Sequence, residues 1–147
     1  MVNMWDYLRK VIKEFPVCTT PAGDHLYKVR DDGKKLNKKQ SEAFHHTVYQ
    51  LLFAANQAWQ DIQTAVSFLT TRVRDPDEDN WKKLVRVLKY LNGTRYMKLT
   101  LVEDEMNFII HWYVDGSHQI HEDCRGQIRS LMTLGKGAAI SSSNKMK

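Results

Sequence analysis

DPDEDNWKKLVRVLKYLNGT, residues 75–94, predicts the most clearly bounded helix of this chain. We expect Asp75 to cap this helix and Pro76 to take its first position, where a missing backbone N–H matters little. Gly93 is expected to end it in the left-handed conformation that glycine adopts easily. Apolar side chains recur at helical spacing and form the stripe predicted to be buried: Trp81, Leu84, Val85, Leu88 and Leu91.

The opposite face of the same helix is basic. Lys82, Arg86 and Lys89 follow one another at helical spacing, and Lys83 lies beside them. Such a face could contact the phosphate backbone of a nucleic acid, but spacing alone favours an ordinary solvated face. The formal net charge of +5 favours anionic partners only mildly.

Two further helices are predicted before this one, over residues 36–59 and 61–73. Asn37 is expected to cap the first, with Gln40 in capping-box position, and Asp61 to cap the second. The apolar residues expected to be buried on these helices are Phe44, Val48, Leu51, Leu52, Ala55, Trp59, Ile62, Ala65, Val66 and Leu69.

The amino-terminal region, residues 1–36, is predicted to hold a short amphipathic helix over 3–15 followed by an aperiodic segment. A structureless segment of this length is uncommon inside a compact domain, so we interpret it as a linker or as an arm laid over a surface. The stretch 28–39 holds six bases and two acids. A solvated linker is favoured there over a phosphate-contacting loop.

After Gly93 the apolar period changes from 3.6 to 2, which predicts strands over 96–102 and 106–114 joined by an acidic turn at 103–105. A further hairpin is predicted over 130–143, around the turn Gly135-Lys136-Gly137. The alternation puts Trp112 with Val114 on one face of its strand, and His111, Tyr113 and Asp115 on the other. A sheet this small with no covering helix is expected to bury little core.

The sequence therefore predicts an α+β chain in three parts: an amino-terminal helix and arm (1–36), a helical region (37–93) and a strand-rich region (94–147).

No apolar run approaches the length of a membrane span, and the amino terminus does not resemble a secretory signal. We expect an intracellular protein of the cytoplasm or nucleus, not a secreted one, that contacts no membrane. Cys18 and Cys124 are expected to be free thiols.

The polar stretch HWYVDGSHQIHEDCRG, residues 111–126, could carry chemistry in two ways. His118, His121 and Cys124 are zinc-ligand types at short spacing, but the sequence offers no second pair of ligands, so a zinc site is disfavoured. Asp115 could be one carboxylate of a two-metal nuclease or a surface residue that opens a turn. Composition alone favours the surface residue.

Several segments together resemble the copia-type retrotransposon polyprotein. They are FHHTVYQLLF, DIQTAVSFLTTRV, DPDEDNWKKLVRVLKYLNGTRYMKLTL and WYVDGSH, in this order. The third contains the pattern W-x2-L-x-R-x-L-x-Y-L-x-G-T, which begins at Trp81 and ends at Thr94. The similarity is to the stretch that follows the reverse transcriptase palm and leads into the ribonuclease H domain.

The resemblance implies a fold and a role for each region. Residues 40–93 would be a thumb or connection region that holds a template–primer duplex, with Lys82, Arg86 and Lys89 contacting its backbone. The strands would be the first antiparallel strands of a ribonuclease H-like fold, in which Asp115 matches the first metal-binding aspartate. The parent enzyme would use magnesium or manganese and act on an RNA–DNA hybrid. Asp115 would bind magnesium only if the other carboxylates were supplied, and we predict no cofactor for this chain alone.

The chain also departs from that family. The polymerase aspartates of the Y-x-D-D motif are expected before Met1, and the other nuclease carboxylates after the third strand. Glu122 and Asp123 match no family ligand, and Ala58-Trp59-Gln60 and Ile128-Arg129 replace the family's usual residues. We therefore expect a polyprotein fragment that is inactive alone. The alternatives are a small basic non-catalytic module that binds nucleic acid, and a zinc-stabilised domain; the sequence predicts no oligomeric state.

Overall fold

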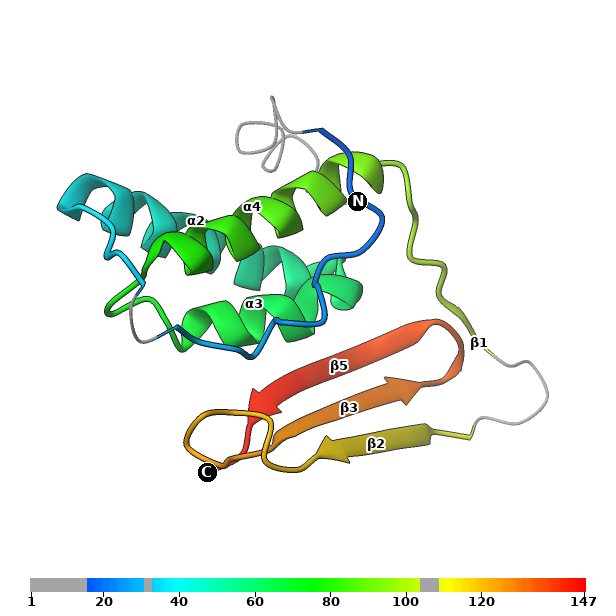
Figure 1. The fold of residues 1–147 in the computed structure, drawn as a ribbon. Coiled ribbons are helices and arrows are strands. Elements are labelled where there is room, and N and C mark those ends of the chain that lie inside the picture. The colour runs from blue at the N-terminus through cyan, green and yellow to red at the C-terminus, as the bar shows by residue number, and fades with distance from the viewer. Residues whose placement is uncertain (1–15, 31–32, 104–108) are drawn as a thin grey trace. The chain divides into compact units, whose positions relative to one another are not determined.

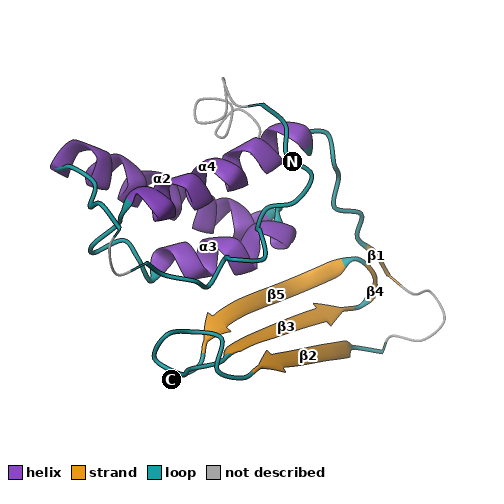
Figure 2. Ribbon diagram, viewed as in Figure 1, coloured by secondary structure: helices purple, strands orange, loops and turns teal. Residues whose placement is uncertain are grey.

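The structure, a computed structural model, describes residues 16–30, 33–103 and 109–147. Helices come first and antiparallel strands follow, so the predicted α+β class is confirmed (Figures 1 and 2). The helix expected over 3–15 lies outside the described residues. The elements are α2 (Lys38–Gln57), the 3₁₀ turn η1 (Gln60–Ile62), α3 (Gln63–Thr70), α4 (Glu78–Gly93), β1 (Val102–Glu103), β2 (His111–Ser117), β3 (Gln127–Thr133), β4 (Gly135–Lys136) and β5 (Ala138–Lys145).

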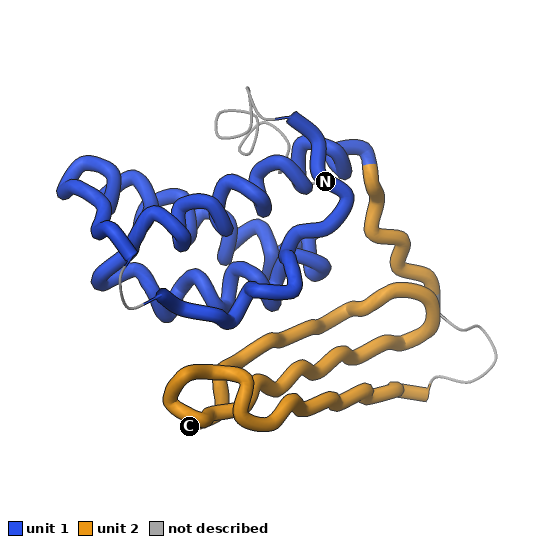
Figure 3. Tube along the Cα trace, in the orientation of Figure 1, with its two compact units in different colours: residues 1–96 blue, residues 97–147 orange. Residues whose placement is uncertain are grey.

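The chain divides into two compact units, Met1–Tyr96 and Met97–Lys147 (Figure 3). The first contains the helices and the second contains the strands. Among the described residues, no helix combines the length and the apolar character needed to cross a lipid bilayer.

Helix α2 begins with the predicted capping box. The backbone N–H of Gln40 donates to the Asn37 side chain at 2.9 Å, and the backbone N–H of Asn37 donates to Gln40 Oε1 at 3.2 Å. Two N–H groups that would otherwise lack partners at the helix start are therefore satisfied by neighbours in sequence.

The entry into α3 differs from the prediction. The chain passes through η1, and no side chain caps α3, so the expectation that Asp61 caps this helix is wrong. The Asp61 carboxylate instead accepts a hydrogen bond from the Tyr90 hydroxyl of α4. The 3₁₀ turn takes the place of a cap because its own hydrogen bonds tighten the entry.

Helix α4 starts later than predicted. Asp77, not Asp75, is its cap and accepts a hydrogen bond from the backbone N–H of Asn80 at 2.7 Å. Asp75 forms an ion pair with Lys35 at 2.6 Å instead. The backbone bridge between Lys35 and Asp77 keeps the residues before Glu78 extended, which moves the helix start toward the carboxyl end.

The end of α4 also differs from the prediction. Gly93 is the last helical residue and does not adopt the left-handed conformation. A Cβ atom at Gly93 would lie 2.6 Å from the Val17 side chain, so glycine lets the arm approach the helix closely. The backbone N–H of Thr94 closes the helix by donating to the Tyr90 carbonyl at 3.0 Å.

The core of the helical unit is built from the predicted stripes, with some additions and one exception: Val85, which was expected to be buried, is half-buried and lies outside this core. Trp81, Leu52 and Trp59 are half-buried and pack against this core. The spacing did not single out Ala54, Phe68, Val87 or Tyr90, which are also buried. The buried members are Leu26, Phe44, Val48, Leu51, Ala54, Ala55, Ile62, Ala65, Val66, Phe68, Leu69, Leu84, Val87, Leu88, Tyr90 and Leu91.

The aperiodic segment before α2 is an arm that lies against the helices. Leu26 is buried in their core, and the Tyr27 ring meets Phe68 edge-on at 5.6 Å. The backbone N–H of Cys18 donates to the Lys89 carbonyl at 3.3 Å. Of the two interpretations of this segment, the arm is therefore correct.

The second unit contains a three-stranded antiparallel sheet in the order β2-β3-β5, and a short β1-β4 pair. The predicted hairpin around Gly135-Lys136-Gly137 is confirmed as β3–β5. Gly137 has a φ of 82°, and a Cβ atom there would collide with the Thr100 carbonyl, so this turn requires glycine. The strand expected over 96–102 is wrong: only its last residue, Val102, lies in a strand.

Strand β2 contributes no buried side chain. All its residues are exposed, including Trp112, which is 57% exposed, and Val114, which is 65% exposed. Among the described residues of this unit, Ala138 is the one buried hydrophobic side chain, while His121, Gln127 and Ser143 are buried polar residues. The expectation that so small a sheet buries little core is confirmed for the described residues.

Tyr90 provides a test of the contact between α4 and Asp61. Burial, together with the hydrogen bond and the negative charge of Asp61, raises the pKa of Tyr90 to about 12. A raised folded pKa means that this contribution to stability is complete below pH 10 and is lost as the pH rises to about 12. Tyr90→Phe should therefore flatten the alkaline fall in the free energy of unfolding, and should cost about 0.5–1.5 kcal/mol at neutral pH.

The measurement is urea unfolding followed by circular dichroism across this pH range, with Tyr49→Phe as the control because Tyr49 is 52% exposed. An unchanged alkaline profile in Tyr90→Phe would show that the folded protein does not raise the pKa of Tyr90.

Candidate nucleic-acid interface

The three basic residues singled out from the sequence lie along α4. Lys82 is exposed, whereas Arg86 and Lys89 are half-buried beside the arm. The helix therefore brings them to one side, as their spacing predicts. Their contact with a nucleic acid stays a prediction.

Arg86 holds the arm in place. Its Nε donates to the Thr20 carbonyl at 3.3 Å, and its Nη2 donates to Thr20 Oγ1 at 2.7 Å. The backbone of Gly23 also approaches the guanidinium group, since a Cβ atom there would lie 3.4 Å from Nη1. Some of the N–H groups of the Arg86 guanidinium, whose planar arrangement suits a phosphate, therefore already form hydrogen bonds within the protein.

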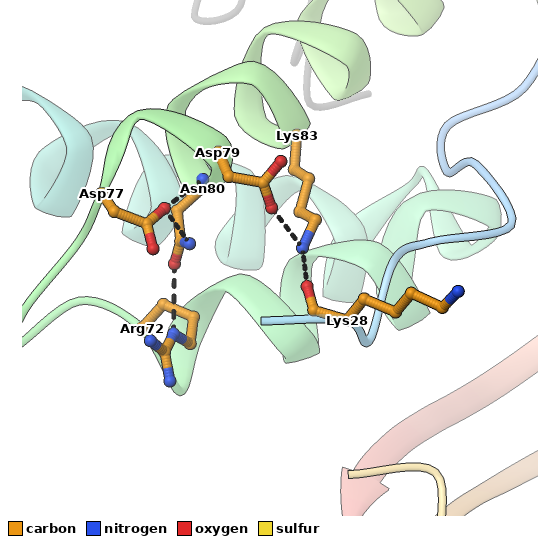
Figure 4. A network of polar contacts seen from close by, with 6 residues as sticks. All are labelled: Lys28, Arg72, Asp77, Asp79, Asn80 and Lys83. Atoms are coloured by element: carbon orange, nitrogen blue, oxygen red, sulfur yellow. Dashed lines mark hydrogen bonds and ion pairs between the residues drawn. The ribbon is translucent and has the colours of Figure 1, made fainter. Parts of the chain in front are cut away.

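Lys83, which the sequence places beside the basic face, also forms contacts within the helical unit (Figure 4). Its Nζ forms an ion pair with Asp79 at 2.8 Å and donates to the Lys28 carbonyl of the arm. The same ammonium group lies 4.9 Å from the centre of the Phe68 ring, within the range of a cation–π contact.

A second set of contacts near the start of α4 surrounds Asn80 (Figure 4). Its side chain donates to the capping carboxylate of Asp77 and accepts from Arg72 Nε at 3.2 Å. Asn80 and Asp77 are fully buried, and their contacts satisfy the Asn80 side chain and Asp77 Oδ1, whereas Asp77 Oδ2 has no hydrogen-bond partner among the described residues.

A cavity of about 450 Å³ lies between the arm and α4. The arm supplies one wall, which contains Leu26, and α4 supplies the other. The lining residues are Cys18, Gly23, His25, Leu26, Asp79, Trp81, Lys82, Lys83, Val85, Arg86 and Lys89. Sequence reasoning found the basic members and placed Trp81 and Val85 in the stripe expected to be buried. It missed the arm residues, because an aperiodic segment does not show which turn of a helix it covers.

The wall of this cavity carries a net positive charge. Asp79 is its one acidic lining residue, and it is paired with Lys83. Within the described residues, no carboxylate lies within ion-pair distance of Lys82, Arg86 or Lys89. Lys82 and Lys89 therefore have no acidic partner within the described residues, whereas Arg86 is engaged with Thr20.

Asp115 lies in β2 and is exposed, opposite Arg129 of β3 in the strand register. It shares a face with His111 and Tyr113, whose rings stack with their centres 6.4 Å apart, as the alternation predicts. In the part of the chain that the structure describes, no three His, Cys, Asp or Glu side chains come together as metal ligands. Asp115 therefore has no assembled metal site around it there.

The loop after β2 is held by polar contacts. The ring Nε2 of His121 lies 2.9 Å from Gln127 Oε1, and Gln127 Nε2 donates to Ser143 Oγ at 2.9 Å. His121 is buried in these contacts, whereas His118 and Cys124 are exposed. The buried His121 side chain therefore helps to hold this loop in place. The three suggested zinc ligands, His118, His121 and Cys124, are not brought together within the described residues.

Asp123 links the same loop to β5 through an ion pair. Its carboxylate lies 2.7 Å from Lys145 Nζ and 3.4 Å from Arg125 Nε. The contact with Lys145, followed by that with Arg125, lowers the pKa of Asp123. This acid is exposed and engaged with these two bases.

Comparison with known proteins gives one informative similarity. No family model matches the chain, and no solved structure matches it. A Saccharomyces cerevisiae protein named for the transposon Ty5-1 is 30% identical over 149 aligned positions, which cover 98% of this chain and 47% of that protein. The chain thus spans about half the length of this relative. It is related to a transposon protein over nearly its whole length, which supports the retrotransposon origin that its motifs predict.

Proposed function

We propose that this chain is the thumb or connection region, and the first ribonuclease H strands, of a copia-type retrotransposon polyprotein. The observation that carries the proposal is the order of elements. Helix α4 and its C-cap, Thr94, contain the tryptophan-to-threonine pattern; α2 and α3 precede it, and an antiparallel sheet with Asp115 on its first long strand follows. The relationship to a transposon protein supports the same origin.

The parent protein in this proposal is an RNA-directed DNA polymerase and RNA–DNA hybrid nuclease that uses magnesium or manganese. It would act inside the cell, in the cytoplasm or the nucleus. Two-metal hydrolysis requires several carboxylates around the metal pair, and Asp115 has no such partners among the described residues. This chain alone is therefore proposed to be catalytically inactive.

The activity proposed for the isolated chain is sequence-independent contact with the backbone of a nucleic-acid duplex. Lys82 is the most accessible cation of the basic face, and Lys89 lies beside the cavity. Arg86 contributes positive charge, but its direct contacts are with Thr20. Binding would depend on phosphate neutralisation and would weaken as salt is added.

The first test is cleavage of an RNA–DNA hybrid by the purified chain with magnesium or manganese. We expect no metal-dependent product from the wild type, and an identical result for Asp115→Asn. Metal-dependent turnover that Asp115→Asn abolishes would contradict the proposed inactivity and would identify Asp115 as a working ligand.

The second test is binding of a blunt-ended RNA–DNA hybrid over a range of salt concentrations, followed by fluorescence anisotropy. Neutralising Lys82 and Lys89 to Gln should weaken binding and reduce the slope of log affinity against log salt by roughly 0.9 for each phosphate that the protein no longer neutralises. Lys38→Gln with Lys39→Gln is the control of equal charge, because both residues lie in the exposed first turn of α2. Equal weakening in the two double variants would indicate a general charge effect and argue against this interface.

A further inference from the structure

The cavity between the arm and α4 has two chemically different sides. Lys82, Arg86 and Lys89 provide positive charge, while Leu26, Trp81 and Val85 provide apolar surface. A volume of about 450 Å³ lies within the range of small-molecule sites. The cavity therefore brings cationic and apolar side chains together within one small space.

Among the described residues, the positive charge on this cavity is incompletely balanced. Arg86 and Lys89 are half-buried, and partial removal of a cation from water is unfavourable without a partner of opposite charge. The carboxylate of Asp79 is engaged by Lys83, and the contacts of Arg86 with Thr20 are with uncharged oxygens. A bound anion would supply the missing negative charge.

A simple inorganic anion would use only part of this space. Trp81 is half-buried, packs against the helical core and lines the cavity. Aromatic side chains that line a binding site stack on nucleobases, and such stacking tolerates any base. The lining therefore fits a ligand that joins a phosphate to a flat aromatic group.

We propose that this cavity binds one unpaired nucleotide, with its phosphate near Lys82 and Lys89 and its base against Trp81. The inference deepens the proposed function and rests on it in one respect: a strand that follows the basic face of α4 would deliver its unpaired end here. A free mononucleotide presents the same chemistry. Arg86 is a positioning residue in this site, because its bonds to Thr20 hold the arm that forms the opposite wall.

The test compares four probes on the full chain: a blunt RNA–DNA hybrid, the same hybrid with a short single-stranded extension, AMP and inorganic phosphate. We expect the extended hybrid to bind at least about fivefold more tightly than the blunt one, as one stacked base would provide. AMP should bind more tightly than phosphate and should compete with the extension.

The variants separate stacking from stability. Trp81→Leu keeps an apolar side chain in the core but removes the ring, and should abolish both the preference for the extension and the binding of AMP. Trp81→Phe should retain them in part. Trp59→Leu is the matched control, because Trp59 is also half-buried against the core but does not line the cavity. Circular dichroism and thermal melting would show that each variant is folded.

The outcomes distinguish this inference from the proposed function. Salt-sensitive binding of the blunt hybrid, with no preference for the extension and no AMP binding, would overturn the nucleotide site and leave the proposed function standing. AMP binding that depends on Trp81, without binding of the blunt hybrid, would support the site and contradict the duplex interface. Phosphate that binds as tightly as AMP, or a Trp81→Leu variant that behaves as the wild type, would overturn the nucleotide site.

Discussion

Backbone pairing between the arm and the segment before α4 is the constraint on which the helical unit depends. The N–H of Leu36 donates to the Pro76 carbonyl, and the N–H of Glu78 donates to the Lys34 carbonyl, both at 3.0 Å. The second bond satisfies an N–H group at the start of α4 that has no partner within the helix. The arm thereby fixes where α4 begins.

This pairing also explains which parts of the helices the sequence could predict. The α2 cap depends on two residues three positions apart, so local sequence contains all the necessary information. Residues 75–77 contain two aspartates that could each cap α4, and the choice depends on Lys35, which is distant in sequence. The role of Asp61 was predicted wrongly for the same reason, because its hydrogen-bond partner, Tyr90, belongs to another helix.

The sheet shows the limits of periodicity in another way. Alternation correctly predicted the two faces of β2, because the side-chain period of a strand is a local property. It did not predict that residues 96–101 stay outside a strand, because a strand also needs a neighbour for its backbone. The hairpin was predictable because its strands are adjacent in sequence and its turn contains Gly137.

The basic face of α4 illustrates why a binding site is harder to predict than a helix. Spacing groups Lys82, Arg86 and Lys89, and places Lys83 beside them. The structure separates them by their partners: Lys83 is held by Asp79 and the arm, whereas no described carboxylate pairs with Lys82 or Lys89. Cations that already bind the protein would have to break those bonds before they could bind a phosphate. Lys82 and Lys89, which have no acidic partner among the described residues, would not have to break such bonds. The cavity that they share with Trp81 is therefore where an anionic ligand would gain the most binding free energy.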